Sequence, residues 1–117
     1  MANPNIVDVT TIRGKTAVLS VTTTPTNMVE NAANSNTILK LNYLSVANID
    51  GTASADITIS VFRSSTEFKI AHTIAVPADS SLTILDRPLY LEEGDSLRLT
   101  ASANGDLQAV CSYEIIS

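Results

Sequence analysis

The chain has 117 residues, of which 44% are hydrophobic and 16% charged, a composition typical of a folded domain and not of a disordered segment. This length allows one domain with a modest core, built mainly from aliphatic residues because aromatic residues are only 4% and Trp is absent. The net charge of -5 and the scattered Lys and Arg residues argue against binding to nucleic acid or to an anionic membrane, which both attract clustered cations.

The first residues and the cysteine content point to folding inside a cell. The opening MANPNIVDVT has no basic stretch followed by an apolar run, so it does not resemble a signal peptide. No segment approaches the roughly 20 apolar residues of a membrane span. Cys111 is the single cysteine, which rules out a disulfide within the chain. We expect the protein to be made in a reducing cytoplasm and not to be secreted.

Alternation of apolar and polar residues is the main structural signal along the chain. Residues 1–5 are expected to form an extended N-terminal arm, because Pro4 cannot donate a hydrogen bond to a β-ladder, and residues 6–117 a single domain. The alternation that follows is typical of half-buried strands. It predicts strands over 6–12, 16–23, 37–48, 55–63, 67–76, 81–85, 88–91, 96–103 and 107–115.

Residues 24–36 are ambiguous, since they fit an extended strand, a hairpin tip or a short helical turn over 28–33. A helix-length pattern is missing elsewhere in the sequence. We therefore predict an all-β fold, an antiparallel β-sandwich that is jelly-roll-like, with about eight or nine short strands. The strand over 37–48 changes the phase of its alternation, which predicts a bulge near Asn42 and Tyr43. Asp50-Gly51 is interpreted as a hairpin turn between this strand and the next.

Three carboxylates surround Gly94 and form the most conspicuous polar cluster. Glu92, Glu93 and Asp95 are residue types that ligate Ca²⁺ or serve as an acid/base pair. The simpler interpretation is a hairpin between the strands over 88–91 and 96–103. Gly94 then supplies the positive φ, Asp95 binds the local backbone, and the glutamates are solvated. We favour the turn, and a cation bound by the three carboxylates remains the alternative.

The residues that carry catalysis in many enzymes are few. His72, the single histidine, shares its parity with Phe68 and Ile70 and is expected to pack at the apolar face or its edge. Cys111 lies in mid-strand without nearby cations and is expected to be a buried structural thiol. One His and one Cys are too few for a zinc site, and the sequence has no nucleophile elbow and no phosphate-binding loop. We predict no enzymatic activity, no cofactor and no metal ligand.

Five residues are candidates for contacts with another protein. Phe62 has the parity of the polar, outward face of its strand and precedes Arg63, so it is a candidate contact residue. The alternative is a second buried face or the end of the sheet. Ile6 and Val7 near one terminus and Ile116 near the other are apolar, and they are expected to meet a neighbouring subunit or to cap the sandwich.

Two stretches of the sequence resemble a known group of proteins. ANIDGTASADITISVF and AVPADSSLTILDRPLYLEEGDSLRLTASANGDLQAVCSYEII are similar to small virion structural proteins of tailed bacteriophages, especially those of marine cyanobacteria. The resemblance covers residues 37–116, and its most distinctive pieces are D-G-T-x-x-x-D-I-T-I and L-Y-L-E-E-G-D-S-L-R-L-T-A-S. These pieces specify strands and carry no catalytic motif, so no site residue is transferred.

The resemblance implies a component of the virion. We expect a capsid decoration (cement) protein that stabilises the head shell, contacts the major capsid protein among other virion proteins, and assembles as a homo-oligomer, in particular a trimer. A tail, baseplate, neck or fibre component is the alternative, because the resemblance does not separate head from tail. A carbohydrate-binding module is a further alternative, which is disfavoured because few aromatic residues have outward parity.

Overall fold

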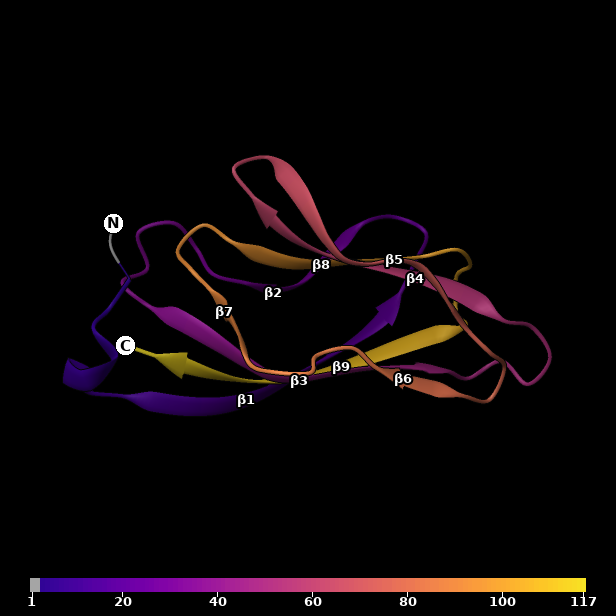
Figure 1. The fold of residues 1–117 in the computed structure, drawn as a ribbon, viewed down its shortest axis with the longest axis horizontal. Coiled ribbons are helices and arrows are strands. Elements are labelled where there is room, and N and C mark those ends of the chain that lie inside the picture. Colours follow the sequence, from indigo (N-terminus) through magenta and orange to yellow (C-terminus); the bar gives the residue numbers. More distant parts are fainter. Residues whose placement is uncertain (1–2) are drawn as a thin grey trace.

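Residues 3–117 of this computed structural model form an elongated sandwich of two antiparallel sheets, with extents of 50 × 27 × 20 Å (Figure 1). Met1 and Ala2 of the predicted arm lie outside the described residues. The elements in chain order are the 3₁₀-helix η1 (Ile6–Asp8) and the strands β1 (Ile12–Val21), β2 (Thr26–Glu30), β3 (Ile38–Asn48), β4 (Ala55–Arg63), β5 (Thr66–Val76), β6 (Ser81–Thr83), β7 (Leu89–Leu91), β8 (Ser96–Ala101) and β9 (Leu107–Ile116).

The strand order confirms the predicted jelly roll. One sheet has the order β1-β9-β3-β6, with β7 also paired to β3, and the other has the order β2-β8-β4-β5. Because β6 and β7 both pair with β3, they act as two halves of one interrupted strand. The chain then behaves as one long hairpin in which β1 meets β9, β2 meets β8, β3 meets β6 and β7, and β4 meets β5, rolled up into two sheets.

The core lies between the two sheets and is aliphatic. Its side chains come from alternate positions of the central strands, and the largest fully buried ones include Leu41, Leu44, Ile57, Ile59 and Leu99. Burying each of these contributes about 1.5–3 kcal/mol of hydrophobic stabilisation. The alternation seen in the sequence is therefore the pattern that places one face of each strand in the core.

The chain before β1 differs from the prediction of a strand over 6–12. Ile6–Asp8 form a 3₁₀ turn, and β1 begins only at Ile12. The reason is local, because the side chain of Asn5 accepts a hydrogen bond from the Val7 backbone (3.1 Å) and its carbonyl accepts one from Asp8 N (3.0 Å). Such bonds offer the backbone an alternative to a strand ladder.

Two uncertain features of the sequence are resolved. The ambiguous stretch 24–36 contains a separate strand, β2, which pairs with β8, and residues 28–33 do not form a helical turn. The predicted bulge in β3 is confirmed, because its register with β9 shifts between Leu41 and Tyr43. The shift lets Leu41 and Leu44 both reach the core despite their opposite parity.

Two turns predicted as hairpins are connections between the sheets. Asp50-Gly51 follows β3 in one sheet and leads to β4 in the other, and Glu93–Asp95 likewise join β7 to β8 across the sandwich. Turn residues identify a reversal of the chain, but they do not say which sheet the next strand joins. The buried Asn48 holds the first of these connections, since its side-chain nitrogen donates to the carbonyls of Ala53 (3.0 Å) and Val76 (2.9 Å).

The prediction for His72 is wrong, because this side chain is exposed. The register between β4 and β5 shifts twice, between Ile57 and Ile59 and between Ile59 and Ser60. Thr73 adopts a positive φ of 47° inside the irregular segment. The extra residues change which side chains face the core, so parity counted along the sequence does not hold in β5.

Candidate functional site

The end of the sandwich that carries both described chain ends contains a cluster of charged side chains. Here the tip of the β4–β5 hairpin, the β7–β8 turn and the segment after β2 lie together (Figure 1). We call this the charged end. The register of β4 with β8, in which Phe62 lies opposite Ser96, places Arg63 across from Asp95.

Arg63 binds two carboxylates at the charged end. Its Nε lies 2.7 Å from Asp95 Oδ1, and its Nη2 contacts Asp95 Oδ2 and Glu92 Oε2, the latter at 2.8 Å. The Asp95 side chain is only 2% exposed, whereas that of Arg63 is 46% exposed. Hydrogen bonding to Asp95 and the nearby charges raise the pKa of Arg63 above its usual value. The two-point pairing fixes the tip of the hairpin in one orientation.

The turn that carries Asp95 is itself fastened to the strand segment beside it. Asp95 Oδ2 accepts a hydrogen bond from Glu92 N (2.9 Å), and Gly94 adopts φ 88°. Asn31 receives the Gly94 N–H at its carbonyl and donates its own N–H to the Asp95 carbonyl, both at 2.9 Å. Its side-chain nitrogen also donates to Leu91 O (3.0 Å). The buried Asn31 thus joins three parts of the chain without an unpaired amide group.

The solvated tip that the sequence suggested is present only in part, because the Glu92 side chain is 48% exposed but Asp95 is not. Asp95 is buried, and the predicted bond to the local backbone is present. Glu92 also accepts a hydrogen bond from Asn3 Nδ2 (2.8 Å), and Glu93 accepts one from the Asn36 backbone. The guanidinium of Arg63 supplies the positive charge that a bound cation would supply. Within residues 3–117, no group of three His, Cys, Asp or Glu side chains is arranged to hold a metal ion.

The structure does not gather the five predicted contact residues into one surface. Ile6 and Val7 project from η1 and are 45% and 88% exposed. Phe62 is on the outward face, as its parity indicates, but it is half-buried under the Arg98 guanidinium, 3.7 Å from the ring centroid. Ile116 is only 3% exposed and lies outside the main core cluster. Their role as contact residues stays a prediction.

A groove beside Arg63 contains aromatic side chains that sequence reasoning missed. Val61, Arg63 and Phe68 line it from the β4–β5 hairpin, and Leu89 and Tyr90 line it from β7. Phe68 is 57% exposed, because the irregular β5 carries it beyond the core. Alternation had placed this side chain on an apolar face, and no sequence signal showed that the β4–β5 register would shift.

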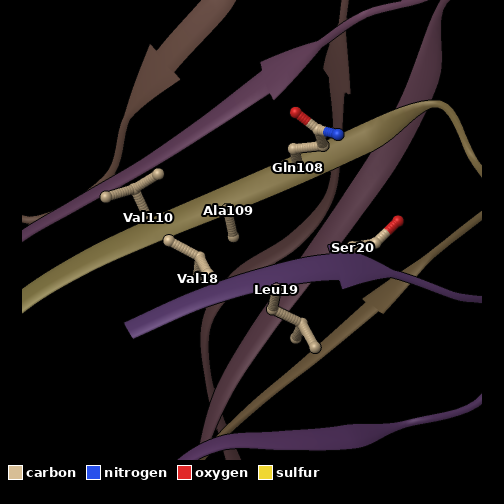
Figure 2. A pocket seen from close by; sticks show the side chains of 6 residues that line it. All are labelled: Val18, Leu19, Ser20, Gln108, Ala109 and Val110. Carbon is tan, nitrogen blue, oxygen red and sulfur yellow. The ribbon is translucent and has the colours of Figure 1, made fainter. Parts of the chain in front are cut away.

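A second hollow lies along the outer face of β1 and β9. Figure 2 shows Val18 and Val110 beside one another, with Ser20 and Gln108 further along the same two strands. Leu19 and Ala109 also border the hollow, but their side chains point to the other side of the sheet, where they contact the core. Val18 lies directly opposite Val110 in the register.

The single cysteine of the chain is not a reactive group in this fold. Cys111 is fully buried, and this burial raises the pKa of its thiol to about 11, so the thiolate is scarce at neutral pH. Among residues 3–117, no helix is long and apolar enough to cross a membrane. Exposed apolar side chains such as those of the two hollows are suited to contacts with another molecule.

Comparisons with known proteins identify the fold. No protein-family model matches the sequence, and no curated protein matches it. A chain from the acidic stable capsid structure of Helicobacter pylori bacteriophage KHP30 is similar with a TM-score of 0.55 and 8% identity, over 93% of this chain and 90% of that one. A chain from Bacillus endospore appendages, described as a novel family of disulfide-linked pili, gives a TM-score of 0.54 and 14% identity over 92% and 88%. At such identities the likeness shows a shared fold alone.

Proposed function

We propose that this chain is a non-enzymatic structural protein of a bacteriophage virion and that it decorates the capsid as a cement protein. The observation that carries the proposal is the jelly roll, which spans the described chain and is similar to a chain of a phage capsid over nearly the full length of both. The resemblance of residues 37–116 to cyanobacterial phage virion proteins supports the same assignment.

The physical properties of the molecule suit such a role. Arg63 and Asn31 fasten the loops of the charged end, so the body presents contact surfaces of fixed shape. A net charge of -5 limits non-specific adhesion to other anionic surfaces. The exposed side chains of Val7, Val18 and Phe68 supply apolar contacts for neighbouring subunits and for the major capsid protein. We propose a trimer as the unit that binds the shell.

A tail or filament component is the second candidate, because the likeness to a pilus subunit is as strong as the likeness to the capsid chain. Those pili are described as disulfide-linked. Cys111, the single cysteine of this chain, is 0% exposed in mid-strand and unavailable to a neighbour without unfolding. A filament of this protein would therefore be held by non-covalent contacts.

Copy number per particle separates these candidates. Mass spectrometry of purified virions with isotope-labelled peptide standards would give on the order of hundreds of copies for a shell protein, and a small ring number for a tail component. A virion reconstruction would then locate the density on the head or the tail. Absence of the protein from purified particles would refute both virion assignments.

Carbohydrate binding is a third candidate, favoured by one observation. Phe68 and Tyr90, 57% and 41% exposed, line the same groove, and sugars stack on exposed aromatic rings. A glycan array with the wild-type protein and with Phe68→Ala tests this role. Signals that vanish in the variant would support sugar binding, and an array without signals would refute it.

A further inference from the structure

Strand β1 has a long edge without the irregularities that protect the other edges of the two sheets. Its register with β9 runs unbroken from Ile12 opposite Ile116 to Val21 opposite Leu107. By contrast, β2 and β5 contain register shifts, and β6 and β7 have three residues each. Bulged or very short edge strands discourage pairing with another chain, whereas a long regular edge presents unpaired N–H and C=O groups to a further strand.

Two cations lie on one face of this edge. Arg13 and Lys15 are exposed, and neither forms an ion pair within residues 3–117. They line a hollow together with Thr11, Ile115 and Ser117. No acidic residue occurs in β1, although the chain as a whole carries a net charge of -5. The edge is therefore a local cationic stretch on an anionic protein.

The opposite face of the same edge is uncharged and open. Val18 is 75% exposed and borders the hollow of Figure 2 beside Val110. Gly14 is on the same face as Val18, and a Cβ atom there would meet nothing within 4 Å. A strand added next to β1 would place its alternate side chains on these two faces, one with the two cations and one uncharged.

We propose that the β1 edge binds an extended acidic strand of a partner protein by strand addition. Carboxylates at alternate positions of the partner strand pair with Arg13 and Lys15, and small apolar residues between them cover Gly14 and Val18. Backbone hydrogen bonds supply affinity, and the two cations select the partner. A second copy of β1 would supply no carboxylate to pair with the two cations, because β1 contains no acidic residue. The proposal does not depend on where the protein lies in a virion.

A labelled peptide tests the proposal on the full chain. The probe is fluorescein-labelled Thr-Glu-Val-Glu-Val-Glu-Thr with both ends blocked, and its counterpart has Lys in place of each Glu. Fluorescence anisotropy should show the acidic peptide binding at least about tenfold more tightly. Arg13→Glu/Lys15→Glu should reverse this preference, while Lys69→Glu/Arg87→Glu, with the same change in net charge away from β1, should leave it unchanged. Circular dichroism establishes that each variant folds.

N-methylated probes distinguish strand addition from simple charge attraction. Methyl groups on one alternate set of backbone amides face β1 and should abolish binding, whereas those on the other set should be tolerated. Equal binding of both methylated probes, or of the acidic peptide to both double variants, would overturn the proposal. So would a stable dimer in sedimentation velocity that Arg13→Glu/Lys15→Glu disrupts, because a second copy would then occupy the edge.

Discussion

The two ends of the sandwich are closed by the same device but reinforced differently. Each end has one buried asparagine whose side-chain nitrogen donates to two backbone carbonyls, Asn31 at the charged end and Asn48 at the far end. At the far end, the remaining support is backbone hydrogen bonding between loops, including Asn48 N to Ser80 O (2.8 Å) and Ile49 N to Asp106 O (2.8 Å). At the charged end, Arg63 and Asp95 add an ion pair.

The difference follows from the geometry of the hairpin. Loops that cross between the sheets run side by side, so their backbones can bond to one another directly. The tip of the β4–β5 hairpin instead projects away from the opposite sheet (Figure 1). A long side chain, that of Arg63, therefore spans to Asp95 and orients the tip. In this protein, the asparagine side chains close the two ends of the sandwich, and the Arg63–Asp95 ion pair positions the projecting tip of the β4–β5 hairpin.

Removing the buried charge should give the largest effect. Asp95→Asn keeps the size of the side chain but loses the pairing with Arg63 and weakens the bond to Glu92 N. We expect the free energy of unfolding to fall by about 2–3 kcal/mol, less than for a fully buried pair because Arg63 is half-exposed. Urea denaturation measures this. Glu92→Gln, at the exposed carboxylate, is the control and should cost less than about 1 kcal/mol.

Removing either asparagine should come next. Asn31→Ala and Asn48→Ala each remove the side-chain donor from one buried and one part-buried carbonyl, for which we expect a loss of about 2 kcal/mol in the free energy of unfolding. Double variants with Asp95→Asn test whether the two ends are closed independently. The loss of stability caused by Asp95→Asn should add to that of Asn48→Ala. With Asn31→Ala, the combined loss should differ from the sum of the two single losses by more than about 0.5 kcal/mol. Equal coupling at both ends would contradict separate closures.

Glycine substitutions at the two ends should have smaller and equal effects. Gly94 at the charged end has φ 88° and Gly105 at the far end has φ 83°. Replacing either by Ala forces a left-handed backbone on a residue with a side chain, at a cost of about 1 kcal/mol in thermal or urea unfolding. Gly14→Ala, where the added Cβ meets nothing within 4 Å, is the matched control and should change stability little.

The smallest effect should be that of acid on the far end. Hydrogen bonds from Thr52 hold the pKa of Asp50 below the usual 3.8 of an aspartate. Because the folded-state pKa is lowered, Asp50 stabilises the native state above pH 3.8, and this contribution disappears as the pH falls through the folded pKa. Asp50→Asn should therefore flatten the decline of melting temperature slightly below pH 4. An unchanged pH profile would show that Asp50 does not contribute.

Most of the fold could be predicted from the alternation of apolar and polar residues along the strands. It predicted the two-sheet antiparallel architecture and the bulge in β3, because both follow from which side chains must reach an aliphatic core. It failed in β5, where extra residues break the period and expose His72 and Phe68. It also failed before β1, where Asn5 makes local bonds that compete with a strand.

The charged end was less accessible to sequence reasoning. Asp95 looked like a turn residue, since nothing in its neighbourhood shows that Arg63, far away along the chain, lies beside it. One signal was available once the jelly-roll order is known. Antiparallel pairing of β4 with β8 that places Phe62 opposite Ser96 also brings the next two residues, Arg63 and Asp95, face to face. Register, and not local composition, identifies this pair.

The position of β9 has a consequence for how the protein is synthesised. Strand β9 lies between β1 and β3, and it pairs Ile12 with Ile116 at opposite ends of the sequence. While a ribosome is making the chain, β1 has no partner until this late strand emerges, so the first sheet closes only after translation of β9. Such distant pairings fold in milliseconds to seconds and not faster. Each nascent chain therefore passes through an interval in which β1 is exposed and the growing chain depends on dilution or on chaperones to stay unaggregated.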